Sequence, residues 1–148
     1  MPPIVIAVDT NVWVSAFITP HGYSARLKQH WRANRFDVVI STELLAELAE
    51  VLVRPRLRIK YGYSHEEVTV YLRSLTELAS IVKVTGRLNL CRDPDDNILI
   101  ETAVLGQAAY IVSRDQDVVR DTKVIQYLES HGIQTMTISR FLRELEHH

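Results

Sequence analysis

Residues 4–11 read Ile-Val-Ile-Ala-Val-Asp-Thr-Asn, and this stretch decides the fold. Its first five residues are apolar, four of them are β-branched, and no polar residue alternates with them. Such a run is typical of a strand buried on both faces, as in the middle of a parallel sheet. The run stops at Asp9, so we expect this carboxylate to lie just beyond the end of a central strand.

Strand-like and helix-like segments alternate along the rest of the chain. Further strands are expected at residues 36–40, 81–84, 110–112 and 133–136. Helices are expected at residues 24–35, between Ser41 and Arg54, at residues 64–80, 96–105 and 123–130, and from Ser139 onward, with residues 56–63 as a basic connector. The alternation predicts a three-layer α/β/α domain around a mainly parallel sheet of about five strands.

Length and composition place the chain among ordinary globular domains. It has 148 residues, 47% apolar and 24% charged, which fits one domain over residues 1–144. The last four residues, Leu-Glu-His-His, are interpreted as the remnant of an expression tag. A single cysteine, the lack of a signal peptide and the lack of a membrane-spanning run favour a cytoplasmic protein. The charge is close to balanced, which neither requires nor excludes a nucleic-acid partner.

Acidic residues recur at the expected strand ends and on helix faces. They form four groups: Asp9 with Asn11, Glu43 with Glu47, Asp93 with Asp96, and Asp115 with Asp117, the last group following Ser113. In a parallel α/β domain the carboxyl ends of the strands meet at one edge, where ligands bind. Gathered carboxylates raise one another's pKa and call for cations. Oxygen ligands select Mg²⁺ or Mn²⁺, so the pattern indicates a metal-dependent phosphodiesterase.

Several of these acids also have a purely structural interpretation. Glu43 lies in a first helical turn, where a negative charge favours the helix dipole, and Glu47 by itself fits an ordinary solvated helix face. Asp93 is able to start a turn with its following proline, and Asp96 to cap its own helix. The residues alone leave these alternatives open.

Four segments in order resemble the PIN-domain ribonucleases, specifically the group regarded as toxin components of toxin–antitoxin systems. They are Val-Asp-Thr-Asn-Val at 8–12, the helix from Ser41 through Glu47 to Pro55, Asp-Pro-Asp-Asp-Asn at 93–97, and Ile-Val-Ser-Arg-Asp at 111–115 with Asp117. The resemblance favours Glu47 over Glu43. It implies catalytic and metal-binding roles for Asp9, Glu47, Asp96 and Asp115, with Asn11, Asp93, Ser113 and Asp117 in support.

The resemblance also implies cofactors and partners. It implies Mg²⁺ or Mn²⁺, an RNA substrate, a small antitoxin protein and a homodimer. The stretch of residues 120–131 is longer than the connection that usually follows the last acidic motif in this family, and this departure concerns the geometry around Asp117. Candidate RNA-binding cations are Arg54, Arg56 and Arg114, each of which also fits a surface salt bridge.

Two other functions fit part of the pattern. Asp9-Thr10-Asn11 partly imitates a phosphatase signature in which the first aspartate is the nucleophile, but that chemistry gives Glu47 no role. A PIN-like domain with a silent site would bind RNA or a protein without cleaving it. The presence of all four principal carboxylates favours the nuclease.

Overall fold

One five-stranded sheet forms the centre of the protein in a computed structural model that describes residues 4–19, 21–114 and 121–147. The strand order is β3-β2-β1-β4-β5, and all four pairings are parallel. This confirms the expected parallel α/β fold. The strands are β1 (Val5–Val8), β2 (Asp37–Ser41), β3 (Ser80–Val82), β4 (Tyr110–Ser113) and β5 (Gln134–Thr137).

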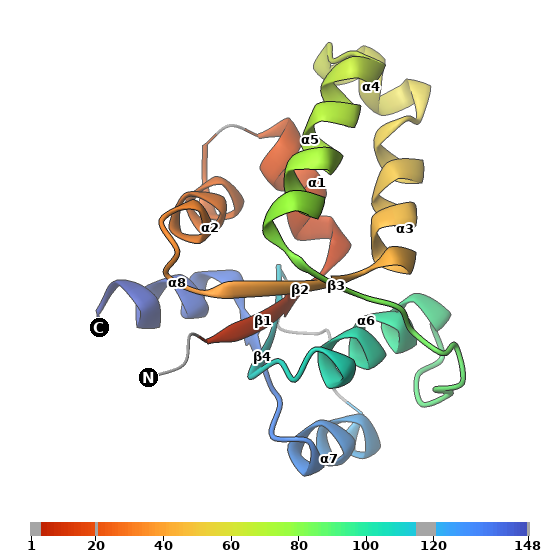
Figure 1. The fold of residues 1–148 in the computed structure, drawn as a ribbon, viewed down its shortest axis with the longest axis vertical. Coiled ribbons are helices and arrows are strands. Elements are labelled where there is room, and N and C mark those ends of the chain that lie inside the picture. Colours follow the sequence, from red (N-terminus) through yellow and green to blue (C-terminus); the bar gives the residue numbers. More distant parts are fainter. Residues whose placement is uncertain (1–3, 20, 115–120, 148) are drawn as a thin grey trace.

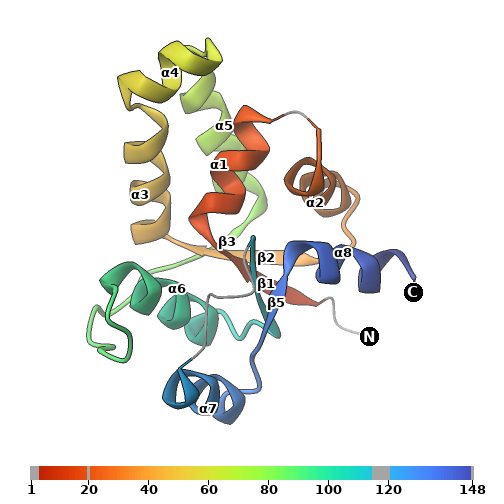
Figure 2. The same cartoon turned by 180° about the vertical axis from the view of Figure 1, so that it is seen from behind.

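Helices cover both faces of this sheet (Figures 1 and 2). One face carries α1 (Thr10–Ile18), α2 (Tyr23–Arg32), α3 (Thr42–Leu52), α4 (Pro55–Tyr61) and α5 (His65–Leu78). The other face carries α6 (Pro94–Leu105) and α7 (Thr122–Ser130). The last helix, α8 (Ile138–Glu146), packs against α2, β4 and β5.

The first strand is buried as its apolar run predicts. Ile6 and Ala7 are fully buried and Val8 is 1% exposed, because helices lie on both sides of the strand. Val8 pairs with Val112 of β4, and the Asp9 amide extends the ladder by donating to the Val112 carbonyl at 3.0 Å. The polar residues that follow β1 and β4 therefore begin at the same edge of the sheet.

Two helices were not expected from the sequence. Residues 10–18 form α1, although this segment contains several β-branched residues that weaken a helical pattern. The expected basic connector contains α4, which begins at Pro55 and ends at Gly62 with φ +70°. No residue of α4 is buried, so it lacks the apolar stripe by which a helix is recognised in sequence.

Some helix boundaries also differ from the expected ones. Helix α6 begins at Pro94 with Asp93 as its cap, two residues before the expected start. The terminal helix is capped by the Thr137 side chain rather than by Ser139, which is the second residue of the helix. Leu78, expected to face inward, is 51% exposed because α5 ends there.

The last residues that the structure describes are part of the packed domain. Leu145 is 9% exposed, and its carbonyl accepts a hydrogen bond of 2.8 Å from Arg35. Glu146 ends α8, and its carboxylate pairs with Arg26 of α2. Among the described helices, none has the length and apolar character that crossing a membrane requires.

Candidate active site

Asp9 stands where the central strand turns into α1. It is half-buried and caps α1, its Oδ1 accepting the Asn11 backbone N–H at 3.3 Å. Its own amide is bound to Val112 on the neighbouring strand. Backbone pairing on one side and helix capping on the other therefore fix the place of this carboxylate. Asn11 follows it with an exposed side chain.

Glu47 is brought to Asp9 by the packing of α3 against α1. The Thr10 hydroxyl donates to Glu47 Oε2 at 3.3 Å, a bond between residues 37 positions apart in the chain. Burial raises the pKa of Glu47, and the charges of Asp95, Asp9 and Asp93 raise it further against the opposing effect of the Thr10 hydroxyl. These shifts agree with the expectation of crowded carboxylates.

Glu43, one turn earlier on α3, has different hydrogen-bond partners. Its carboxylate accepts the Thr42 hydroxyl and, at 3.0 Å, the Val84 backbone N–H beyond β3. These hydrogen bonds lower its pKa, the Thr42 hydroxyl having the largest effect. Glu43 thus joins α3 to the segment after β3, whereas Glu47 faces the other acids. The structure separates two glutamates that the residues alone left undecided.

Asp96 joins the group from the first turn of α6. It is half-buried, and burial is the main cause that raises its pKa, followed by the charges of Asp93, Asp9 and Asp95. Asp93 is exposed and caps α6, its Oδ1 accepting the Asp95 N–H at 2.9 Å. Asp93 therefore caps the helix and also belongs to the acidic group, because its charge acts on both Glu47 and Asp96.

We call Asp9, Glu47, Asp93, Asp95 and Asp96 the carboxylate cluster. Asp95 is exposed, yet among the carboxylates its charge has the largest effect on the pKa of Glu47. Sequence reasoning missed this role. The available signal was the N-terminal turn of α6, where three acids within four residues spread over the surface of one helix end.

Asn97 is a second residue that sequence reasoning did not single out. It is 8% exposed, and its Oδ1 accepts the backbone N–H groups of Leu90 at 3.0 Å and Cys91 at 2.7 Å. Its Nδ2 donates to the Cys91 carbonyl at 3.2 Å. These bonds hold the segment before α6 against the helix and so set the position from which Asp93 and Asp96 extend.

The fourth acidic group is only partly described. Ser113 ends β4, is 3% exposed and lies next to the strand that leads to Asp9. Asp115 and Asp117 lie outside the described residues. Arg114 is exposed at the end of β4.

The other two candidate RNA-binding cations lie away from the cluster. Arg54 follows α3 at the end far from the sheet and comes within 4.0 Å of Glu50, with both side chains exposed. Arg56 is exposed on α4, which forms the tip of the molecule in Figure 1. Arg54 lies seven positions after Glu47, beyond the C-terminal end of α3 at Leu52.

The donor set of the cluster is suited to a hard divalent cation. Its side chains offer carboxylate oxygens alone. Burial first, and then the charges of neighbouring aspartates, raise the pKa values of Glu47 and Asp96, and a cation would compensate that neighbouring charge. Within the described residues no three His, Cys, Asp or Glu side chains already form a metal cage. The cluster therefore fits a cation chemically, although its described carboxylates do not yet converge on one point.

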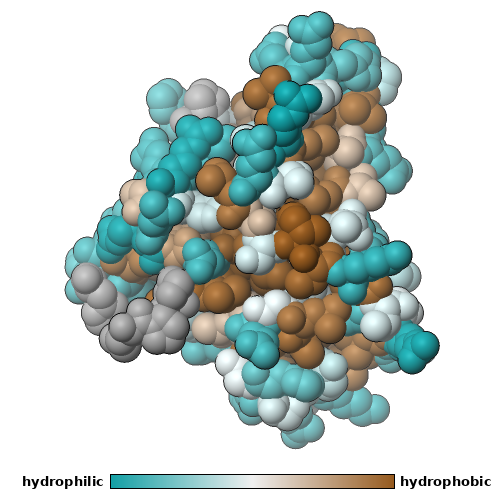
Figure 3. All heavy atoms as spheres, in the orientation of Figure 1, coloured by the Kyte–Doolittle hydropathy of each residue, from teal (hydrophilic) through white to brown (hydrophobic). Residues whose placement is uncertain are grey.

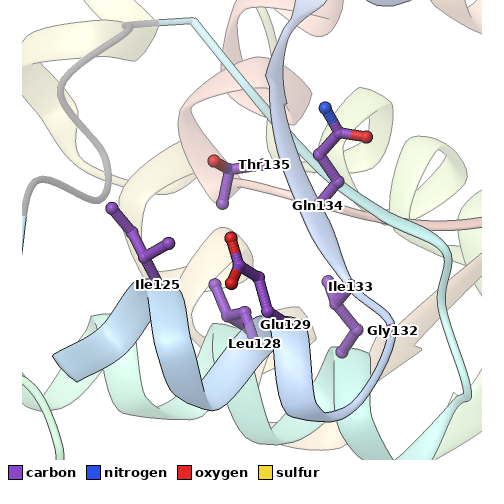
Figure 4. Close-up of a pocket in the computed structure, with 7 residues that line it drawn as sticks. All are labelled: Ile125, Leu128, Glu129, Gly132, Ile133, Gln134 and Thr135. Atoms are coloured by element: carbon purple, nitrogen blue, oxygen red, sulfur yellow. The ribbon is translucent and has the colours of Figure 1, made fainter. Parts of the chain in front are cut away.

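A separate hollow lies between α7 and β5 (Figure 4). Its volume is about 470 Å³, and it is lined mainly by residues of α7 and of the turn into β5, among them Ile125, Leu128 and Ile133. None of the candidate site residues lines it.

Comparison with known proteins agrees with the geometry. The family model for the PIN domain matches residues 5–117. An uncharacterized protein of Methanocaldococcus jannaschii is 28% identical over 145 residues, covering 97% of this chain and 92% of that protein. The crystal structure of VapBC2 from Rickettsia felis, bound to a DNA fragment from their promoter, contains a chain that superposes with a TM-score of 0.53 at 15% identity. This match covers 90% of this chain and 98% of that chain.

The matched region contains the carboxylate cluster and the strands that present it. At 15% identity the crystal structure supports the fold, while the family model covers well over half of the chain. PIN domains are generally nucleases, and the nucleases among them generally use divalent metals. On this evidence the chain belongs to the PIN-domain family.

Proposed function

We propose that this protein is a Mg²⁺- or Mn²⁺-dependent endoribonuclease that hydrolyses single-stranded RNA. The observation that carries the proposal is that Glu47 of α3 and Asp96 of α6 both lie close enough to Asp9, at the carboxyl edge of the sheet, for its charge to act on them. A fold that holds acids together at the cost of mutual repulsion needs a reason, and binding a cation together with a polyanion supplies one.

Asp9, Glu47 and Asp96 would hold the metal, with Asp115 as a fourth ligand and Asn11, Asp93, Ser113 and Asp117 in support. A bound divalent ion supplies charge neutralisation of the phosphate and a water of lowered pKa. The protein's own contribution is positional. Thr10 orients the Glu47 carboxylate, and the Asp9 backbone is held by β4.

RNA beside so many acids needs cations at the periphery. Arg114 directly follows β4, and Arg54 and Arg56 lie beyond the far end of α3; all three are exposed and able to reach phosphates. Their expected effect is on affinity, because phosphate contacts position a strand without reading its sequence.

The biological setting we propose is a toxin–antitoxin pair in the cytoplasm. A chain of the VapBC2 complex shares this fold, and that supports a small antitoxin protein as a partner. A homodimer is part of the same proposal. The alternative is a silent PIN domain that binds RNA or protein without cutting it, and a phosphatase with Asp9 as nucleophile is a third.

Cleavage of a mixed-sequence single-stranded RNA tests the proposal. Purified protein is assayed with Mg²⁺, with Mn²⁺ and with EDTA, beside Asp9→Asn and Asp96→Asn. We expect metal-dependent cutting that both substitutions abolish. Folded protein that cuts under none of these conditions and also shows no Mn²⁺ binding by calorimetry would identify a silent domain. Release of phosphate from an aryl phosphate would instead support the phosphatase.

A further inference from the structure

Basic and acidic residues are segregated along this chain. From Thr10 to Phe36 there is no Asp or Glu, while four cations occur: Arg26, Lys28, Arg32 and Arg35. The rest of the chain has the other 13 of the 17 Lys and Arg against all 18 Asp and Glu. The nearly balanced total charge therefore conceals a basic segment, which forms α2 and its C-terminal flank.

Two of these cations share one wall of a groove. Lys28 and Arg32 are one helical turn apart on α2, so their side chains lie on the same face of the helix. They line a groove of about 620 Å³ between α2, α1 and α5, whose apolar part includes Phe17 and Tyr71. Figure 3 shows hydrophilic residues gathered over α2 in the same orientation as Figure 1.

The charges of Lys28 and Arg32 are not matched by ion pairs. In the described part of the chain neither has a carboxylate within salt-bridge distance, whereas Arg26 pairs with Glu146. The Lys28 ammonium lies 4.5 Å from the centre of the Tyr71 ring. Burial, and then the charge of Arg32, lower the pKa of Lys28, as expected for a half-buried ammonium beside a second cation.

The opposite wall of the groove carries acids that do not cancel this charge. Glu67 accepts the backbone N–H and the hydroxyl of Ser64 in the capping box of α5, both at 3.3 Å. Glu66 is exposed beside it in the first turn. An anion entering the groove would approach from the α2 side, where Arg32 is exposed and the half-buried Lys28 ammonium lies over the Tyr71 ring.

We propose that α2 is a second binding site for the nucleic-acid backbone, in which Lys28 and Arg32 hold phosphates of the strand beyond the carboxylate cluster. The choice of RNA as the polyanion rests on the proposed function. Helix α1 connects the two regions, and its nine residues span about 13 Å. A strand of several nucleotides would be needed to reach both.

Binding measurements without metal test this site independently of catalysis. The affinity of fluorescein-labelled single-stranded RNA of about 4 and about 16 nucleotides is measured in EDTA, at salt concentrations from about 50 to 200 mM. Each lost phosphate contact on a single strand lowers the slope of log affinity against log salt by about 0.7. For Lys28→Gln/Arg32→Gln we expect the slope with the longer RNA to fall by about 1.4. Across this fourfold range of salt, the affinity of the wild type should therefore fall about sevenfold more than the affinity of the variant.

Three comparisons make the result specific. Arg87→Gln/Lys123→Gln removes the same charge from exposed positions elsewhere and should keep the wild-type slope. Lys28→Arg/Arg32→Lys preserves both positive charges and should also show the wild-type slope. Melting curves verify that every variant is folded. The 4-nucleotide RNA should bind the wild type and Lys28→Gln/Arg32→Gln alike.

Several outcomes would overturn the proposal. One is an unchanged slope in folded Lys28→Gln/Arg32→Gln, and another is an equal loss in the control pair. Displacement of the RNA by polyglutamate at equal charge concentration would assign α2 to an acidic protein segment instead. Absence of cleavage in the separate metal-dependent assay would count against the proposed activity but not against α2 binding.

Discussion

Replacing Asn97 by alanine tests how the segment before α6 is held. The substitution removes two hydrogen bonds accepted from Leu90 and Cys91 and one donated to the Cys91 carbonyl. Each such bond contributes a net stabilisation of about 0.5–1.5 kcal/mol. Because Cys91 is half-buried, water is able to reach part of the freed backbone, and we expect a total loss of about 2–3 kcal/mol.

Urea unfolding at pH 7 in EDTA measures this loss, and thermal unfolding gives a second value. For a chain of this size each kcal/mol lowers Tm by about 3–4 °C, so Asn97→Ala should melt about 6–12 °C lower. Mn²⁺ should also stabilise the variant less than the wild type, since Asp93 and Asp96 extend from the released segment. Asn11→Ala is the matched control, because its exposed amide should matter by no more than about 0.5 kcal/mol. A loss in Asn97→Ala as small as that of the control would refute the reasoning.

Three further predictions concern the cluster and the packing beneath it. In EDTA, folding raises the pKa of Glu47 and Asp96, so the folded state binds more protons than the unfolded state. The free energy of unfolding therefore falls as the pH rises from the ordinary pKa values of these groups through the raised ones. Asp96→Asn should therefore raise stability at pH 7 relative to pH 4, by less than about 1 kcal/mol because the group is half-exposed, and urea midpoints that shift equally at both pH values would contradict this. Mn²⁺ at 100 times its Kd should stabilise the wild type by about 2.7 kcal/mol, and Asp9→Asn should lose this gain in a thermal-shift titration. Gly106→Ala should cost about 1–3 kcal/mol in urea unfolding, since a Cβ there would meet Val39 Cβ at 2.6 Å, and Val39→Ala/Gly106→Ala should recover part of the loss.

The main architecture follows from the sequence because its signals are strong and local. The unbroken apolar run of β1 can be satisfied only by burial on both faces, and the Ser64–Glu67 capping box marks the start of α5 in sequence as in the structure. The helix α4 could not be recognised in this way. None of its residues is fully buried and only Leu57 packs against the core, so its pattern is indistinguishable from that of an exposed connector.

Most members of the carboxylate cluster could be identified in the sequence, but their arrangement could not. Strand ends place Asp9 and Ser113 side by side, which parallel pairing requires. The choice of Glu47 over Glu43 depends on the rotation of α3 against α1 and on the Val84 amide, and these are tertiary features with no local signal. The same holds for Asn97, whose partners lie in a loop without a regular pattern.

The most direct test of the central claim compares two glutamates one turn apart on the same helix. Glu47→Gln and Glu43→Gln each remove one charge from α3, and RNA cleavage is measured under single-turnover conditions over a range of Mn²⁺ concentrations. We predict that Glu47→Gln lowers the cleavage rate by at least about a hundredfold, while Glu43→Gln stays within about tenfold of the wild type and mainly lowers stability. Equal rates in Glu47→Gln and wild type, with both proteins folded, would contradict the assignment of the carboxylate cluster as the nuclease site.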